Sequence, residues 1–220
     1  KINNLSIINH VYQRAKSTSI GEVYVATGDK VIFDEVVENG GKCVLTEKEH
    51  ETGTDRIFEA YKKLNLNNID YIINLQGDEP MIDIEDIKNL NFKAISKKSD
   101  IATLACKIKD ETILKNSNTV KVITEQELFN NNISKAINFS RESLSNSRIN
   151  VYHHIGIYIY TRKSLKQYVE LPPSPAEKIR KLEQMRAMEN NMDIKVGYCD
   201  SNPLSVDTLG DLKKIEKEMS

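Results

Sequence analysis

The first hundred residues alternate between two hydrophobic periods, and this alternation constrains the fold more than any other feature. Apolar residues recur at helical spacing in 6–16, 31–38, 54–64 and 83–96. Short β-rich runs separate these segments at 22–27, 42–45 and 71–75. Strands that alternate with helices predict an α/β fold with a parallel sheet and right-handed crossovers. Ligands of such sheets bind beyond the carboxyl ends of the strands, so the residues after each strand are candidates for function.

After residue 100 the pattern changes to strands with little helix between them. The β-rich runs are 101–108, 119–124, 136–140 and 153–160. They predict an antiparallel or mixed section inserted in the α/β body, which we place at about 115–165. One helix is predicted at 176–189, then a strand at 194–199 and an amphipathic helix at 208–219. We interpret residues 1–220 as a single domain.

Composition narrows the class of protein. The 39% apolar content of the 220 residues is enough for a sizeable core, and the net charge of −1 gives no general attraction to nucleic acid or to an anionic membrane. No apolar run approaches the roughly 18 residues that span a bilayer, and no signal-peptide pattern opens the chain. We therefore expect a cytoplasmic protein without membrane insertion.

The three cysteines, Cys43, Cys106 and Cys199, are far apart in the sequence. None has the spacing of a zinc ligand, and none is next to a histidine. We expect them to be buried thiols in a reducing compartment. A catalytic cysteine is the less favoured alternative.

The segment Gln76-Gly77-Asp78-Glu79-Pro80 follows the most apolar strand. Glycine permits a ligand to approach the backbone closely, and an aspartate at a strand end can hold a hard cation such as Mg²⁺ against phosphate oxygens. A plain turn explains the segment about equally well, because Gly, Asp and Pro are common turn residues.

A second aspartate follows an extended stretch near the end of the chain, in Val206-Asp207-Thr208. Taken alone, Asp207 or Thr208 is best interpreted as the N-cap of the helix that follows. Taken together, Asp78 and Asp207 are two carboxylates beyond apparent strands that can meet over one metal ion. The pair predicts a magnesium site for a nucleoside triphosphate.

Two further segments carry polar side chains beside regular elements. Thr54 and Asp55 suit the start of a helix, and the exposed amides there, with Arg56, can also bind part of a nucleotide. His153 and His154 are strand neighbours that point to opposite faces, so they do not readily share one ion. His154 and Tyr158 share a face and are candidates for substrate binding, with a purely structural pair as the alternative.

The motifs together resemble the family of cytidylyltransferases that activate 3-deoxy-D-manno-octulosonate (Kdo) for lipopolysaccharide synthesis. Eight segments occur in family order, and related enzymes for other acid sugars lack the full set. The matching segments are 53–56, 74–81, 118–122, 139–141, 154–158, 173–175, 182–186 and 206–208.

The resemblance implies a three-layer, Rossmann-like nucleotidyltransferase fold with a mostly parallel sheet, and a homodimer formed partly through the inserted β section. It implies that Mg²⁺ is bound by Asp78 and Asp207, which are also the catalytic residues. The residues that it places near the cytidine nucleotide are Arg56, Gln76 and Asp78. The residues that it places around the sugar are His154, Tyr158, Glu183 and Gln184.

The implied substrates are CTP and Kdo, and the implied products are CMP-Kdo and pyrophosphate. The chain departs from the family in two places. It begins after the family's first strand and basic phosphate-binding loop, so we expect this 220-residue polypeptide to be weakly active or inactive. The residues that follow Arg141 also differ from the family pattern. The alternatives are a cytidylyltransferase for a related acid sugar, such as 8-amino-Kdo, and an inactive homologue that binds a nucleotide sugar.

Overall fold

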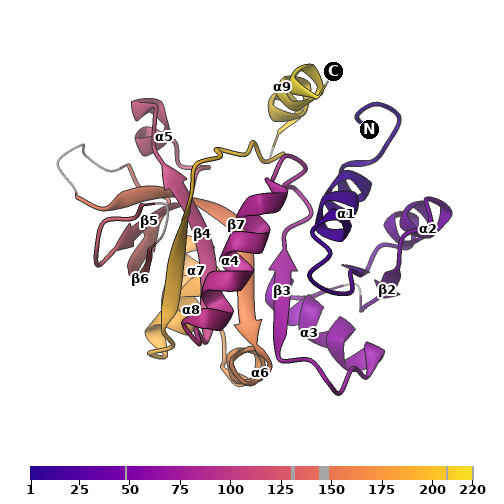
Figure 1. The fold of residues 1–220 in the computed structure, drawn as a ribbon, viewed down its shortest axis with the longest axis horizontal. Coiled ribbons are helices and arrows are strands. Elements are labelled where there is room, and N and C mark those ends of the chain that lie inside the picture. Colours follow the sequence, from indigo (N-terminus) through magenta and orange to yellow (C-terminus); the bar gives the residue numbers. More distant parts are fainter. Residues whose placement is uncertain (48, 130–131, 144–148, 207, 220) are drawn as a thin grey trace. The chain divides into compact units, whose positions relative to one another are not determined.

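The computed structural model describes residues 1–219 except 48, 130–131, 144–148 and 207. The chain forms two compact units, each considered by itself. The first unit comprises Lys1–Ile69, Asn74–Asn89 and Pro203–Ser220, and the second comprises Asp70–Ile73 and Leu90–Asn202. Figure 1 labels most of their helices and strands.

The first unit is built around a short parallel strand pair. Its elements are α1 (Ile7–Ser17), β1 (Val25–Thr27), α2 (Lys30–Glu38), β2 (Cys43–Leu45), α3 (Gly53–Leu64) and α9 (Leu209–Glu218). β1 and β2 pair in parallel, with Val25 opposite Cys43, as the alternating pattern predicts. α2 and α3 pack against both strands. Tyr12, Val25 and Val36 form a small buried core between α1, α2 and β1.

The second unit contains a six-stranded sheet in the order β3-β7-β4-β8-β6-β5, with β7 also pairing with β5. The strands are β3 (Tyr71–Leu75), β4 (Ile101–Lys107), β5 (Lys121–Thr124), β6 (Ile133–Ser140), β7 (Val151–Thr161) and β8 (Ile194–Cys199). Every residue of β4 except Lys107 is buried, as expected for a central strand that is covered on both faces.

The sheet is mixed, which corrects the prediction of a mostly parallel sheet. β4 and β8 pair in parallel. β7 is antiparallel to β4 and to β5, and β6 is antiparallel to β5 and to β8. No described helix lies between β5 and β6, so this pair lacks the helical crossover that a parallel pair requires. The antiparallel character predicted for this part of the chain is confirmed.

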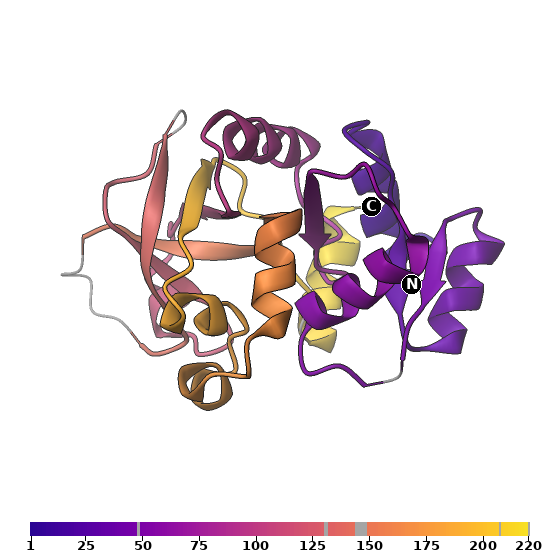
Figure 2. The ribbon, with the colours of Figure 1, turned by 90° about the horizontal axis from the view of Figure 1, so that it is seen from below.

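Five helices accompany the sheet in the described part of the chain: α4 (Ile84–Ser96), α5 (Glu111–Lys115), α6 (Arg162–Glu170), α7 (Pro175–Arg180) and α8 (Gln184–Glu189). α4 passes close to β8 at Gly197. A β-carbon added at Gly197 would lie 3.3 Å from Leu90 Cδ1 of α4. α6 follows β7 directly and packs on it, as the two adjoining orange elements in Figure 2 show.

Two helix predictions need correction. The single helix expected at 176–189 is two short helices, because Lys181 adopts a left-handed conformation with φ of 54° and ends α7. α6 was not expected at all. Its buried face includes Ser164 beside Leu165 and Tyr168, so its apolar stripe is weak in the sequence. None of the described helices combines the length and apolar character needed to cross a membrane.

Candidate active site

Asp78 lies three residues beyond the end of β3, in the first unit. Gln76 and Asp78 are half-buried, while Gly77 is exposed between them. A β-carbon at Gly77 would lie 3.0 Å from Ile8 Cδ1 of α1, so a small residue lets this loop pack on the helix. Asn74, the buried residue before the strand ends, donates a hydrogen bond of 3.4 Å to Thr54 Oγ1 of α3. The loop is therefore attached to two helices of its own unit.

The segment before Asp207 runs beside Asp78. Val206 N donates a 2.9 Å hydrogen bond to Asp78 O. Asp207 itself lies outside the described residues. Thr208 is the N-cap of α9 and forms a reciprocal capping box with Asp211, which confirms the capping interpretation of this segment. The backbone contact brings the two aspartate-bearing segments together, as the prediction of a shared site requires.

Both segments suit a hard cation by their chemistry. Asp78 Oδ1 is buried, and carboxylate oxygens are the ligands that Mg²⁺ prefers. Among the described residues, no three side chains of His, Cys, Asp or Glu converge as a metal site. A metal ion shared by Asp78 and Asp207 stays a prediction, because Asp207 lies outside the described residues.

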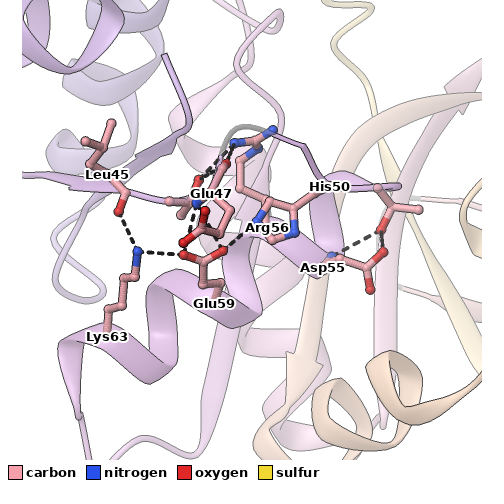
Figure 3. Close-up of polar contacts among 9 residues, drawn as sticks. Leu45, Glu47, His50, Asp55, Arg56, Glu59 and Lys63 are labelled. Atoms are coloured by element: carbon pink, nitrogen blue, oxygen red, sulfur yellow. Dashed lines mark hydrogen bonds and ion pairs between the residues drawn. The ribbon is translucent and has the colours of Figure 1, made fainter. Parts of the chain in front are cut away.

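Hydrogen bonds near the start of α3 hold the side chain of Arg56 in place (Figure 3). Its Nη1 donates to Thr46 Oγ1 at 2.8 Å and to Glu47 O at 3.2 Å. Glu59, one turn further along α3, accepts from the Glu47 amide at 3.1 Å. Arg56 and Glu59 therefore connect the segment after β2 to α3.

Glu59 is the centre of this network. His50 Nε2 lies 2.6 Å and Lys63 Nζ lies 2.7 Å from its carboxylate oxygens, and Lys63 also donates to Leu45 O at 2.9 Å. Burial opposes ionisation of Glu59, but hydrogen bonds from Lys63, the Glu47 amide and His50 outweigh it and lower its pKa. The carboxylate is therefore ionised and holds the loop that Arg56 contacts.

The cap of α3 differs from the prediction. Thr52 is the N-cap, and its Oγ1 accepts from Asp55 N at 3.1 Å. Thr54 lies inside the helix and is fully buried. Asp55 occupies the first turn, where its charge suits the helix dipole as expected.

His154 belongs to β7 in the second unit, and its tautomer follows from its contacts. Thr103 Oγ1 donates a 2.6 Å hydrogen bond to Ile157 O and lies 2.9 Å from His154 Nε2. The hydroxyl has one proton, which the carbonyl takes, so His154 must donate from Nε2. Nδ1 is then the acceptor nitrogen of the ring. Burial, with the positive charges of His153 and Arg141, lowers the pKa of His154 to about 3, so the ring is neutral.

His154 and Tyr158 lie side by side, as their spacing predicts. Their ring centroids are 5.3 Å apart. Phe139 of β6 meets the other side of His154 edge to face at 5.3 Å. The aromatic row continues from Tyr158 to Tyr160 and then to Tyr168 of α6, with centroids 6.1 Å apart at each step.

Glu183 faces this aromatic row from the turn before α8. Burial and, after it, the negative charge of Glu183 raise the pKa of both Tyr158 and Tyr168. Tyr168 also donates from its hydroxyl to Glu183 O at 3.0 Å. Gln184, the first residue of α8, is buried. The structure thus brings His154, Tyr158 and Glu183 into one cluster, with Gln184 adjacent to it in the chain.

An ion pair that the sequence did not reveal supports this turn. Arg186 Nε and Nη2 donate to Glu177 Oε2 and Oε1 at 2.9 and 2.7 Å, and both residues are buried. The guanidinium also lies over the Tyr168 ring at 4.6 Å. Ser174 N donates to Glu177 Oε2 at 3.0 Å in a capping box. α7, α8 and α6 are therefore linked around Glu183.

The positive charge of Arg141 affects the pKa of two residues in the same cluster. The charge of Arg141 contributes to the low pKa of His154 and opposes the rise at Tyr158. Arg141 Nη1 donates to Asn118 O at 2.7 Å, which anchors the side chain to the loop before β5. Arg141 lies in one of the eight matching segments, but its sequence context indicates no role for it. Thr103 and Tyr168 had no signal in the sequence.

Three comparisons with known proteins agree with one another. A family model described as "Cytidylyltransferase" matches residues 1–194. The 3-deoxy-manno-octulosonate cytidylyltransferase of Rhodopseudomonas palustris (strain BisB18) is 40% identical over 220 residues, which cover 100% of this chain and 89% of the relative. The enzyme of the same name from Thermodesulfovibrio yellowstonii is 43% identical over 226 residues, covering 98% and 89%.

A solved structure is similar over the same length. The CMP:2-keto-3-deoxy-manno-octonic acid synthetase complexed with CTP matches with a TM-score of 0.87 and 34% identity. The match covers 100% of this chain and 89% of that one.

Proposed function

The chain belongs to the 3-deoxy-manno-octulosonate cytidylyltransferase family, and we propose that it transfers the cytidylyl group of CTP to Kdo, with release of pyrophosphate. The observation that carries this function is the match, along the whole chain, to relatives of that name at about 40% identity. The likeness to a synthetase complexed with CTP supports the same reaction.

The reaction requires that the two substrates are positioned and that the negative charge of the phosphates is neutralised. The anomeric hydroxyl of Kdo attacks the α-phosphorus of CTP, the bond to the β-phosphate oxygen breaks, and pyrophosphate leaves in line. We assign Asp78 and Asp207 as the residues that hold Mg²⁺. When bound, the ion supplies positive charge to the phosphate oxygens. The hydrogen bond from Val206 N to Asp78 O supports this pairing.

Arg56 and Gln76 are assigned to the nucleotide. Gln76 is half-buried directly after β3, where ligands of an α/β sheet bind. Arg56 secures the segment after β2 through Thr46 and Glu47. Its role in this proposal is to shape the nucleotide site by holding that segment.

The cluster in the second unit suits an acid sugar. Neutral His154 offers an acceptor at Nδ1, Tyr158 offers a hydroxyl, and Glu183 offers carboxylate oxygens, which together match the hydroxyl groups of Kdo. The positive charge of Arg141, which acts on both His154 and Tyr158, suits the sugar carboxylate. We assign His154, Tyr158, Glu183 and Gln184 to sugar binding on this basis.

The proposal extends to a homodimer that uses the inserted section, and to a cytoplasmic enzyme of lipopolysaccharide synthesis. Exposed apolar side chains in that section support an interface, with Phe129, Ile137 and Ile149 exposed by 60, 55 and 82%. Ile137→Lys should give a monomer in light scattering. An unchanged molar mass would contradict this interface.

The central experiment measures pyrophosphate release from the whole gene product with CTP and a panel of acid sugars. Kdo should be the preferred sugar, and a preference for 8-amino-Kdo would redirect the assignment. Asp78→Asn and Asp207→Asn should each abolish turnover and leave the circular dichroism spectrum unchanged. Removal of Mg²⁺ by a chelator should also abolish turnover. Near-normal rates in either variant would contradict the metal assignment. No turnover with any sugar, together with binding of CMP-Kdo, would favour an inactive homologue.

A further inference from the structure

Two cysteines that are 93 positions apart in the chain become neighbours in the six-stranded sheet. Cys106 of β4 is the direct partner of Cys199 of β8 in a parallel register. Residues opposite each other in a parallel pair point to the same face. Cα atoms of such partners lie about 4.8 Å apart, within the range of roughly 4.4–6.8 Å that a disulfide spans.

His153 extends this pair to a row of three side chains, which we call the cysteine row: Cys199, Cys106 and His153. His153 of β7 is the antiparallel partner of Cys106 on its other side, and its Nδ1 lies 3.8 Å from Cys106 Sγ. Cys106 Sγ donates to Asn202 Oδ1 at 3.1 Å, and Nδ1 of His153 lies 3.1 Å from the same oxygen. No cysteine is next to a histidine along the chain. The contact between Cys106 and His153 exists only because their strands pair.

Several neighbours of Cys106 favour its thiolate, whereas the hydrogen bond that its thiol donates to Asn202 Oδ1 favours the protonated form. A hydrogen bond from Cys199 is the strongest influence that lowers the pKa of Cys106, and burial acts against it. A hydrogen bond and the charge of His153, with the charge of Lys109, act in the same direction as Cys199. The thiolate is the form of cysteine that reacts with oxidants.

The row lies on the sheet face opposite to His154. His153 and His154 are successive residues of one strand, and successive side chains alternate between faces. His154 contacts Thr103, whereas His153 contacts Cys106 and Asn202. The cysteine row is therefore separate from the residues assigned to the sugar.

We propose that Cys106 and Cys199 form an oxidative modification site, in which a small peroxide converts the two thiols into a reversible intramolecular disulfide. Both cysteines are free thiols in this structure. Cys106 is buried, but it contacts the exposed side chain of Asn202, which gives a molecule the size of hydrogen peroxide a short approach.

The chemistry balances with peroxide as the oxidant. The Cys106 thiolate attacks one peroxide oxygen, the O–O bond breaks, and water leaves after protonation, so that sulfur loses two electrons and becomes a sulfenic acid. The Cys199 sulfur then attacks the Cys106 sulfur, the S–O bond breaks, and the thiol proton leaves with hydroxide as a second water. Two thiols and one peroxide thus give one disulfide and two waters, and a dithiol reverses the change.

The chain supplies its own control cysteine. Cys43 is half-buried in β2 of the first unit, and burial raises the pKa of its thiol. We therefore expect the Cys106 thiol to be more reactive than the Cys43 thiol. Cys43→Ser leaves the row intact and removes the third thiol from the count.

The test treats the reduced protein with hydrogen peroxide, alkylates the remaining thiols, and maps the peptides by mass spectrometry. We expect a Cys106–Cys199 linked peptide, a fall from three alkylatable thiols to one, and recovery of all three with dithiothreitol. Cys43→Ser should fall from two thiols to none. His153→Gln should slow the loss of thiols by roughly threefold to tenfold, because less of Cys106 is thiolate.

Three outcomes would overturn the proposal. The first is that both row cysteines stay alkylatable at peroxide concentrations that oxidise a free thiol such as glutathione. The second is that Cys43 reacts as fast as Cys106. The third is that the disulfide joins two chains, seen as a dimer that dithiothreitol dissociates on a denaturing gel. The measurement counts thiols and not turnover, so its result is independent of the proposed enzymatic function.

Discussion

Thr103 fixes His154 in one tautomer. Because the threonine hydroxyl donates to Ile157 O, it can only accept from His154 Nε2. The ring is neutral and presents its Nδ1 acceptor beside Tyr158, whose ring centroid is 5.3 Å away. A residue on β4 thereby sets what a residue on β7 can offer to a ligand.

Thr103→Val should weaken sugar binding without changing the shape of the core. Valine keeps the volume of threonine but leaves the buried Nε2–H without its acceptor, at a cost of about 1–3 kcal/mol. We expect a higher KM for Kdo, an unchanged KM for CTP, and a lower urea midpoint. Thr103→Ser retains the hydroxyl and is the matched control. Equal KM values for Kdo in the two variants would contradict the positioning role of Thr103.

The buried His154 should make stability depend on pH. Its folded pKa of about 3 lies below the value of about 6.5 for an unfolded histidine. Between these values the unfolded chain binds a proton that the folded chain does not, so stability is full above about pH 6.5 and falls as the pH decreases. The slope from this group is at most about 1.4 kcal/mol per pH unit.

Urea unfolding of wild type and His154→Gln at pH 7 and pH 5 checks this dependence. The wild type should lose more stability than the variant between these two pH values. The comparison isolates His154, because the other histidines titrate equally in both proteins. A parallel loss in the two proteins would show that His154 is protonated in the folded state.

Arg186→Met should be strongly destabilising. It leaves the buried carboxylate of Glu177 without its bidentate partner, and breaking a buried pair from one side costs about 3–5 kcal/mol. Adding Glu177→Gln removes the remaining charge and should restore part of the loss. Lys166→Ala is the control, because its pair with Glu170 is exposed and contributes at most about 0.5 kcal/mol. Equal urea midpoints for Arg186→Met and Lys166→Ala would refute this account.

Glu59→Ala should impair nucleotide binding while sparing the sugar. The carboxylate holds the Glu47 amide, His50 and Lys63 together, and Arg56 contacts the same loop through Thr46 and Glu47. We expect KM for CTP to rise several-fold and KM for Kdo to stay constant in steady-state assays. Asp34→Ala, which removes only an exposed pair with Lys30, should change neither. A rise in both constants after Glu59→Ala would indicate general unfolding of the first unit.

The sequence predicts regular elements well where one period dominates. β3 is predicted at 71–75 and is found there, because the β-formers Tyr71, Ile72 and Ile73 leave little ambiguity. β8 was likewise expected at 194–199 and is found there. The pairing of His154 with Tyr158 followed from the two-residue period of a strand. These features depend on local order alone, which is what a single sequence contains.

Features that depend on distant residues were missed or displaced. The break between α7 and α8 rests on the left-handed Lys181, a conformation that no local composition indicates. The cap of α3 is Thr52 and not Thr54, since Thr54 is enclosed by the core and receives the Asn74 side chain. Thr103 gained its role from His154, 51 positions further along the chain, and Cys106 gained its role from Cys199, 93 positions further along. Such contacts are set by sheet register, which periodicity does not give.

The position of β8 between β4 and β6 also has a consequence for biosynthesis. During translation β4, β5, β6 and β7 are synthesised before Ile194–Cys199, so the nascent sheet lacks one of its inner strands until β8 is made. Strand edges that wait for a late partner are prone to pair with other chains. The second unit therefore completes its sheet only after Ile194–Cys199 has been made, and its folding rate should be limited by this long-range insertion.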